Sequence, residues 1–167
     1  MADLPSGKDD ARPDAQGLVH QHTLRVYWED TDAGGIVFYA NYLKFFERAR
    51  TEWLRAAGIG QQALRERTGA IFVVAETALR YHRPARLDDE LRVTVVLQEA
   101  GRASMAIDQQ AWRGEELLAE GRIRIGCVDE RTLRPCRIPA EVLQALQRLP
   151  APAHGRGGAL RASPSGC

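Results

Sequence analysis

The sequence has 167 residues, the length of one ordinary domain, and hydrophobic residues make up 44% of it, enough to bury a sizeable core. Lys and Arg number 23 against 22 Asp and Glu, and the resulting formal net charge of +1 argues against a dedicated nucleic-acid-binding protein. The sequence holds no apolar run long enough for a membrane-spanning helix.

The two ends of the chain differ in composition from its middle. Residues 1–18 and 150–167 are rich in Pro, Gly, Ala and charged residues, and we expect both to be disordered tails around a folded domain at residues 19–149. The N-terminal stretch lacks the apolar segment of a secretory signal. The three widely spaced cysteines do not suggest a disulfide framework, so a cytoplasmic protein is expected.

The first half of the domain combines a strand, a turn and a helix. Apolar and polar residues alternate over residues 22–28, which predicts a strand, and EDTDAGG at residues 29–35 has the composition of a turn. A three- and four-residue spacing then predicts an amphipathic helix over residues 39–57, with Gly58 ending it. Its expected apolar stripe comprises Tyr39, Tyr42, Leu43, Phe46, Ala49, Trp53 and Ala57.

The second half is mostly strand. Alternation predicts strands over residues 71–81, 91–97, 103–112 and 117–127, and the last three are joined by short turns, as in an antiparallel meander. A final helix is predicted over residues 139–149. One long helix covered by one curved antiparallel sheet is an α+β arrangement, and its bare edges and outer face predict dimerisation or higher assembly.

The turn before the long helix carries the residues best suited to chemistry. Asp30, Asp32, Gly34 and Gly35 lie between a strand and a helix start, where unpaired N–H groups and the positive end of the helix dipole are found. A carboxylate facing such donors can act as base or nucleophile opposite an oxyanion hole. Alternatively, one of the two aspartates merely caps the turn through its side chain.

Other motif interpretations of the sequence fit less well. A calcium-binding EF-hand loop starting at Asp30 would have Asn41 where a bidentate Glu is needed, and Gly34-Gly35-Ile36 lacks the Lys-Ser/Thr of a phosphate-binding P-loop. His20 and His22 have no second pair of zinc ligands nearby, and no Gly-x-Ser-x-Gly elbow occurs. No metal site and no cofactor are therefore expected.

The segment EDTDAGGIVFYANYLKFFERARTEWLR, residues 29–55, resembles the YbgC branch of the hotdog-fold acyl-CoA thioesterases, which are related to hydroxybenzoyl-CoA thioesterases. The resemblance continues through YHRPARLDD, residues 81–89, and the strands that follow, to about Pro139. It implies a hotdog fold, in which a curved antiparallel sheet wraps one long central helix. It also implies hydrolysis of acyl-CoA to a carboxylate and free CoA.

The resemblance assigns roles to individual residues. Asp32 corresponds to the catalytic carboxylate, as nucleophile or as general base, and the backbone N–H of Tyr39 to the oxyanion donor. Tyr27 corresponds to an assisting tyrosine. Some members carry His at the position of Tyr39, and its replacement here argues against a mechanism that depends on this histidine but leaves the backbone donor intact. The remaining expected substrate-binding residues are Gly34, Gly35, Ile36, Val37, Arg102 and Ser104.

Arg102 in the turn GRAS is the residue expected to contact the phosphates of coenzyme A, although it could equally be an ordinary exposed turn arginine. The resemblance further implies a homodimer or homotetramer, and thioesters of acyl carrier protein as possible substrates. An alternative role is a binding or scaffold protein of the Tol-Pal envelope system with secondary thioesterase activity. The helix face carrying Arg48, Arg50 and Arg55 would then bind the partner proteins, unless these arginines simply form a solvated surface.

Overall fold

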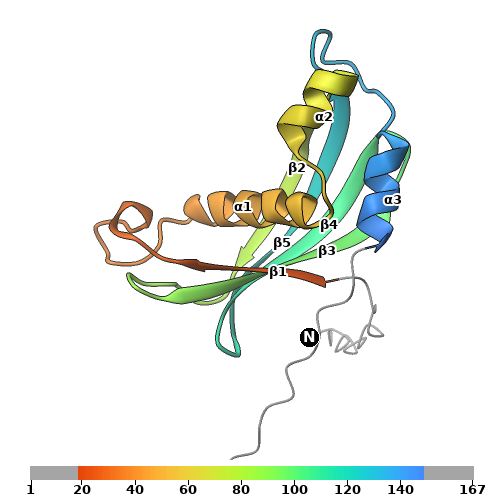
Figure 1. Ribbon diagram of the computed structural model, residues 1–167. Coiled ribbons are helices and arrows are strands. Elements are labelled where there is room, and N and C mark those ends of the chain that lie inside the picture. The colour runs from red at the N-terminus through yellow and green to blue at the C-terminus, as the bar shows by residue number, and fades with distance from the viewer. Residues whose placement is uncertain (1–18, 149–167) are drawn as a thin grey trace, which may run out of the picture.

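The computed structural model describes residues 19–148, and the disorder expected for both tails falls outside these residues. Figure 1 shows helix α1 lying across one face of a strongly curved sheet, with the two shorter helices toward one end of that sheet. In chain order the elements are β1 (Val19–Arg25), a 3₁₀ turn (Trp28–Asp30), α1 (Asn41–Ala56), α2 (Gln61–Thr68), β2 (Ala70–Tyr81), β3 (Glu90–Ala100), β4 (Ser104–Arg113), β5 (Glu116–Asp129) and α3 (Ala140–Arg148).

All neighbouring strands of the sheet are antiparallel, in the order β1-β3-β4-β5-β2. The meander predicted for the last three strands is confirmed as β3-β4-β5, and the α+β arrangement is confirmed with it. Strands β1 and β2 are the edges of the sheet. Strand β2 has a bulge between Val74 and Glu76, which interrupts the alternation expected for residues 71–81.

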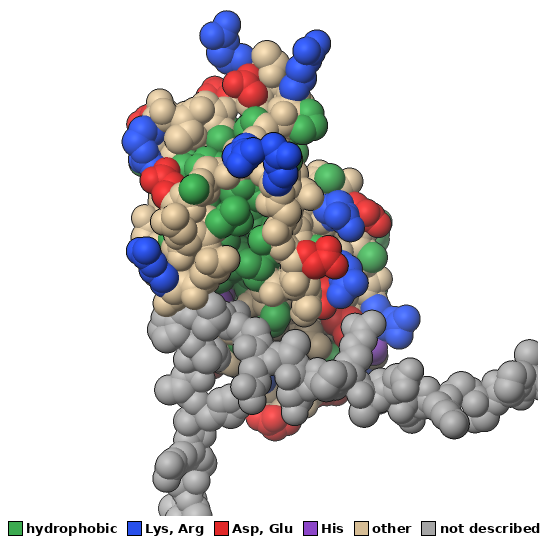
Figure 2. All heavy atoms as spheres, turned by 90° about the vertical axis from the view of Figure 1, so that its right-hand side faces the viewer, with side chains coloured by type: hydrophobic (Ala, Val, Ile, Leu, Met, Phe, Trp, Pro, Cys, Tyr) green, Lys and Arg blue, Asp and Glu red, His purple; other side chains and the backbone are tan. Residues whose placement is uncertain are grey.

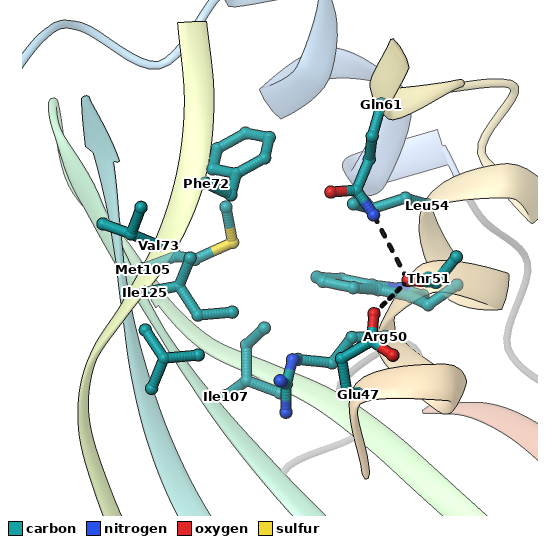
Figure 3. Close-up of a pocket in the computed structure, with 12 residues that line it drawn as sticks. Glu47, Arg50, Thr51, Leu54, Gln61, Phe72, Val73, Met105, Ile107 and Ile125 are labelled. Carbon is teal, nitrogen blue, oxygen red and sulfur yellow. Dashed lines mark hydrogen bonds between the residues drawn. The ribbon is translucent and has the colours of Figure 1, made fainter. Parts of the chain in front are cut away.

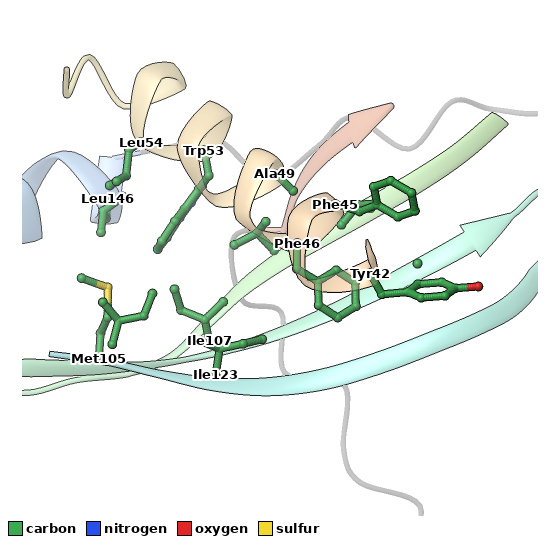
Figure 4. Packing of buried hydrophobic residues seen from close by; sticks show 14 of the residues in the cluster. Tyr42, Phe45, Phe46, Ala49, Trp53, Leu54, Met105, Ile107, Ile123 and Leu146 are labelled. Carbon is green, nitrogen blue, oxygen red and sulfur yellow. The ribbon is translucent and has the colours of Figure 1, made fainter. Parts of the chain in front are cut away.

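Helix α1 is held by an aromatic and aliphatic contact with the inner face of the sheet (Figure 4). Phe46, Ala49 and Trp53 are buried there, as the helical spacing predicts. The predicted stripe was wrong at its N-terminal end, because Tyr39 lies before the helix with 64% of its surface exposed and Leu43 is 42% exposed. The buried positions not foreseen on this helix are Asn41, Phe45 and Leu54.

The Phe46 ring of α1 packs against the sheet at Gly121 of β5. A Cβ atom at this position would collide with Leu79 Cδ2 and lie 3.1 Å from Phe46 Cε2. Only a residue without a side chain lets the Phe46 ring reach the sheet, so the sequence places glycine under the helix for a packing reason.

Two elements depart from the prediction. Strand β1 is Val19–Arg25 rather than residues 22–28, since the chain turns at Tyr27 and Trp28 lies in the 3₁₀ turn with 80% of its surface exposed. Helix α2 was not predicted, because its sequence is polar and buries only Leu64. Viewed from the side of α3, apolar side chains are visible at the centre of the face and charges of both signs are interspersed around them (Figure 2).

Candidate active site

Asp30 is the structural aspartate of the loop between β1 and α1. Its side chain is 2% exposed and accepts a hydrogen bond from the Tyr27 N–H at 2.9 Å. Its carbonyl oxygen accepts two more at 2.9 Å, from the Phe38 N–H and from Asn41 Nδ2. Since these bonds join the two ends of the loop just before α1, Asp30 is used for holding the loop in place.

Asp32 has the opposite environment at the tip of the same loop. Its Oδ1 accepts a hydrogen bond from the Gly34 N–H at 2.8 Å, and its backbone pairs with Ile36 and with Gly35, which adopts a φ of +72°. The turn-capping interpretation is thus correct for one carboxylate oxygen. The side chain is exposed, and Oδ2 accepts no hydrogen bond from the described residues, so it is open to a reactant.

The start of α1 presents unpaired donors. The helix has no side-chain cap at Ala40 and no acidic residue in its first turn, and the N–H groups of Tyr39 and Ala40 donate to no residue within 19–148. The Tyr81 hydroxyl donates to the Tyr39 carbonyl at 2.9 Å and so fixes the peptide plane that carries the Ala40 N–H. Burial raises the pKa of Tyr81, which keeps this donor protonated. Unpaired donors at the positive end of a helix dipole are suited to binding an anion.

Exposed aromatic rings surround this loop, which Figure 1 shows beyond the N-terminal end of α1. Tyr27 is 60% exposed, Phe38 42% and Tyr39 64%, and the Tyr27 hydroxyl has no hydrogen bond within the described chain. The structure therefore brings Tyr27, Asp32 and Tyr39 into one loop. An apolar surface of this kind is typical of an interaction site.

The other residues predicted to contact substrate differ in whether they are exposed or buried. Gly34 and Gly35 are exposed and Ile36 is half-buried, but Val37 is 3% exposed and its N–H donates to the Ala85 carbonyl at 2.8 Å. Val37 therefore belongs to the core rather than to an open surface.

Arg102 and Ser104 lie at the far end of the sheet. Arg102 is exposed in the turn between β3 and β4, whereas Glu90, the first residue of β3, pairs with Arg25 beside the Asp32 loop. The 11 residues of β3 lie between the two places and span up to roughly 35 Å along the strand. One chain alone does not bring Arg102 to Asp32.

A cavity of about 120 Å³ lies between the C-terminal half of α1 and the sheet (Figure 3). Arg50 lines it and donates to Gln109 Oε1 at 2.8 Å, and burial lowers the pKa of the Arg50 guanidinium. Thr51 donates to Glu47 Oε1 at 2.7 Å and accepts a hydrogen bond from Gln61 at 3.3 Å. The apolar walls include Trp53, Leu54, Phe72, Met105, Ile107 and Ile125, and Asp32 and Tyr39 do not line this cavity.

Sequence reasoning missed Tyr81 and the Arg50–Gln109 pair. Tyr81 begins the segment YHRPARLDD and was available as a candidate, but nothing in the sequence links it to the Tyr39 peptide. Within residues 19–148, no group of three or more His, Cys, Asp or Glu is arranged to hold a metal ion. The helices of this part of the chain are too short or too polar to cross a membrane.

Comparison with known proteins gives consistent results for sequence and fold. Residues 26–146 match the thioesterase-like superfamily. The acyl-CoA thioesterase YbgC of Haemophilus influenzae is 42% identical over 75% of this chain and 93% of its own length. The acyl-CoA thioester hydrolase YbgC of Escherichia coli is 40% identical, over 72% and 90%.

The crystal structure of a probable thioesterase from Bartonella henselae superimposes with a TM-score of 0.70 at 31% identity, and the match covers 72% of this chain and 99% of that one. The hotdog fold expected from the resemblance is confirmed by this superposition together with the superfamily match. The chain belongs to the thioesterase-like superfamily and, within it, to the YbgC branch.

Proposed function

We propose that this protein hydrolyses acyl-CoA thioesters to a carboxylate and free CoA. The names of the relatives from Haemophilus influenzae and Escherichia coli support the reaction class. The observation that carries the proposal is the exposed Asp32 carboxylate, which lies in the loop leading to the uncapped start of α1. Thioesters of acyl carrier protein present the same reacting group and remain within the proposed substrate class.

In the proposed mechanism Asp32 either attacks the thioester carbonyl or removes a proton from the attacking water. In the first case the CoA thiolate departs and an acyl anhydride forms on Asp32. Water then hydrolyses this anhydride. In both cases the carbonyl oxygen becomes negative and accepts a hydrogen bond from the Tyr39 N–H. One such donor is typically worth about 3 kcal/mol of transition-state stabilisation. The free Ala40 N–H, oriented through Tyr81, would be a second donor, and the Tyr27 hydroxyl would assist from the same loop.

The contacts to coenzyme A require a second chain in this proposal. Arg102 and Ser104 would bind the phosphates, but in one chain they lie at the far end of β3 from Asp32. We therefore propose that Arg102 of one subunit serves the Asp32 site of another. This makes a homodimer the minimal active unit, and a homotetramer would be built from two such dimers.

Strand β2 is the edge through which we propose that the dimer forms. It has 12 residues, and Val74 near its middle is 52% exposed. A long edge strand with an exposed apolar residue favours pairing with another chain. Light scattering at micromolar concentration should report at least a dimer, whereas a stable monomer would contradict the shared site.

The catalytic assignment is tested by Asp32→Asn, assayed with short, long and aromatic acyl-CoAs. We expect kcat to fall by two to three orders of magnitude with an unchanged melting temperature, because Asp32 Oδ1 makes one turn hydrogen bond that Asn preserves. Asp30→Asn is the matched control, since an amide oxygen can still accept from the Tyr27 N–H. Undiminished turnover in Asp32→Asn, or a larger loss in Asp30→Asn, would reject the choice of Asp32.

The Tol-Pal scaffold alternative receives less support from the geometry. Of the three arginines proposed to form its surface, Arg50 is half-buried and bonded to Gln109, and Arg55 pairs with Glu52. Only Arg48 of the three has neither an ion pair nor a side-chain hydrogen bond to a described residue. A pull-down at low salt with the wild-type chain and Arg48→Gln distinguishes the two roles. The cytoplasmic location expected from cysteine usage remains part of the enzyme proposal.

A further inference from the structure

Cys127 and Cys136 are free thiols that lie next to each other. Their sulfur atoms are 3.5 Å apart, although the sequence spacing gave no reason to pair them. The chain leaves β5, turns, and returns alongside it, so that the Cys136 N–H donates to the Cys127 carbonyl at 2.9 Å. The neighbouring residues Val128 and Pro135 form an antiparallel bridge. The two cysteines are therefore directly opposite partners.

This backbone arrangement permits a disulfide. One backbone hydrogen bond, from the Cys136 N–H to the Cys127 carbonyl, joins the two residues. Opposed antiparallel residues have Cα atoms about 4.5–5.5 Å apart, which lies inside the range of about 4.4–6.8 Å that disulfides require. We propose that Cys127 and Cys136 are a redox modification site, which a low-molecular-weight disulfide such as oxidised glutathione converts reversibly to an intramolecular disulfide. Cytoplasmic disulfides are commonly of this transient kind.

The two thiols take different roles in the reaction. Burial, and then the contact with Cys136, raise the pKa of Cys127 to about 12, whereas Cys136 is partly exposed. The Cys136 thiolate attacks one sulfur of glutathione disulfide, giving a mixed disulfide and one glutathione thiolate, which takes up a proton. Cys127 then loses its proton and attacks Cys136 Sγ, releasing the second glutathione. The two cysteines are oxidised by two electrons, and one glutathione disulfide is reduced to two thiols.

The site is directly connected to the turn that carries Arg102. The Cys127 N–H donates to the Ala103 carbonyl at 2.8 Å, and the Ile138 N–H, two residues after Cys136, donates to the Arg102 carbonyl at 2.7 Å. A disulfide would join the two segments whose N–H groups hold this turn. Oxidation therefore restrains the backbone of Arg102, and its effect on coenzyme A binding rests on the proposed function.

The modification is tested on the full chain carrying Cys167→Ser, which leaves Cys127 and Cys136 as the two thiols of the sequence. After incubation with oxidised glutathione we expect both thiols to disappear under denaturing conditions and the intact mass to fall by two hydrogens. Peptide mapping should find Cys127 linked to Cys136, and dithiothreitol should restore both thiols. Persistent thiols, or glutathione retained on Cys136 without the link, would overturn the proposal.

Single variants separate the roles of the two sulfurs. Cys127→Ser should stop at a stable glutathione adduct on Cys136, and Cys136→Ser should leave Cys127 unmodified. The reverse pattern would contradict the assigned order of attack. In the chain that retains both Cys127 and Cys136, closing the short loop with a disulfide should raise the melting temperature by roughly 5–10 °C. An unchanged melting temperature in the oxidised protein would contradict an unstrained fit of the disulfide to the native backbone, because strain would then cancel the stabilisation.

The effect of the disulfide on coenzyme A binding through Arg102 is measured separately, by the KM for acyl-CoA. We expect oxidation to lower the KM for acyl-CoA by about twofold to fivefold with kcat unchanged, because the turn is already ordered before coenzyme A binds. Arg102→Gln should abolish this difference. An unchanged KM in the oxidised wild type would disprove the coupling, even with the disulfide mapped. Absence of any thioester hydrolysis would contradict the proposed function, while the mapping of the disulfide would still decide the modification.

Discussion

Helix α1 and the loop that leads into it differ in how much of their surface one chain covers. Along the helix, Phe46 and Ala49 are 0% exposed and Trp53 is 2% exposed against the sheet. In the loop just before it, Phe38 and Tyr39 are 42% and 64% exposed, and the N–H groups of Tyr39 and Ala40 have no partner within the described chain. One chain therefore covers the helix face, while our proposal requires a second chain to complete the site at the loop.

The difference follows from what each part packs against. Helix α1 lies on a sheet that provides a glycine beneath the Phe46 ring and apolar side chains around it. Phe38 and Tyr39 in the preceding loop lie largely outside these contacts, and this loop is positioned by the hydrogen bonds of Asp30 and Tyr81. Packing therefore stabilises the helix, while polar contacts position the residues proposed for chemistry.

The largest expected effect comes from truncating a ring on the buried face of the helix. Phe46→Ala should lower the free energy of unfolding by about 3–5 kcal/mol at every protein concentration, because it leaves a cavity between α1 and the sheet. Phe38→Ala is the matched control in the exposed loop, where we expect weakened dimerisation instead. Chemical denaturation and sedimentation measure the two effects. An equal loss of stability in both variants would contradict the division between helix and loop.

A mixed-subunit experiment tests whether the site at the exposed loop is completed by a second chain. Asp32→Asn and Arg102→Gln chains should each have low activity at subsaturating acyl-CoA. A mixed dimer should recover about half of the wild-type activity, because one of its two sites combines Asp32 of one chain with Arg102 of the other. Since random pairing makes about half of the dimers mixed, an equimolar mixture should recover about a quarter. Activity is assayed after the two variants are unfolded and refolded together.

The control for this experiment is a mixture of Asp32→Asn with the double variant Asp32→Asn/Arg102→Gln, which contains no intact site in any combination. Recovery there would indicate contamination. If the first mixture shows no more activity than the average of its components, Arg102 and Asp32 do not serve the same substrate molecule across subunits.

Much of the fold could be predicted from local patterns. The spacing over residues 39–57 predicts α1 closely, since large apolar residues recur on one face, and alternation predicts the β3-β4-β5 meander. Helix α2 could not be found in this way, because it buries only Leu64 and is stabilised by its position between α1 and β2. Trp28 misled the prediction of the first strand, since an exposed aromatic residue continued the alternation.

The site was predictable as a segment but not as a set of contacts. The turn residues and the helix start identify the Asp32 loop, and the structure shows Asp30 as the buried member of the pair. The bonds from Tyr81 to Tyr39 and from Arg50 to Gln109 join residues 42 and 59 positions apart. Such pairings depend on strand register and helix placement, which residue spacing does not encode.

A smaller effect on activity is expected from Tyr81→Phe. Loss of the hydroxyl removes the hydrogen bond to the Tyr39 carbonyl, worth about 1 kcal/mol, so kcat should fall by roughly fivefold with KM unchanged. Tyr42→Phe is the matched control, since the Tyr42 hydroxyl accepts the Ala85 N–H within the core and should affect stability alone. A raised KM in Tyr81→Phe would show that Tyr81 contacts substrate rather than positioning the peptide.

The smallest effect expected is a pH dependence of stability that arises from His20 on β1. Burial, followed by the neighbouring His22, lowers the pKa of His20 on β1 below 6.5, with Glu52 opposing, and His20 Nε2 is buried without a hydrogen bond in the described chain. Below about pH 6.5 the unfolded chain therefore binds a proton at His20 more readily than the folded chain does. The free energy of unfolding consequently decreases as the pH is lowered.

Thermal melting of wild type and His20→Gln at pH 7.5 and pH 5.5 measures this contribution. The wild type should lose more stability between the two pH values than His20→Gln does, because the glutamine cannot take up a proton in the unfolded chain. His82→Gln is the control at an exposed strand end, where His82 pairs with Glu120 at 3.1 Å. An equal loss in wild type and His20→Gln would show that His20 is hydrated in the native protein and that the edge at β1 is less tightly packed than the rest of the core.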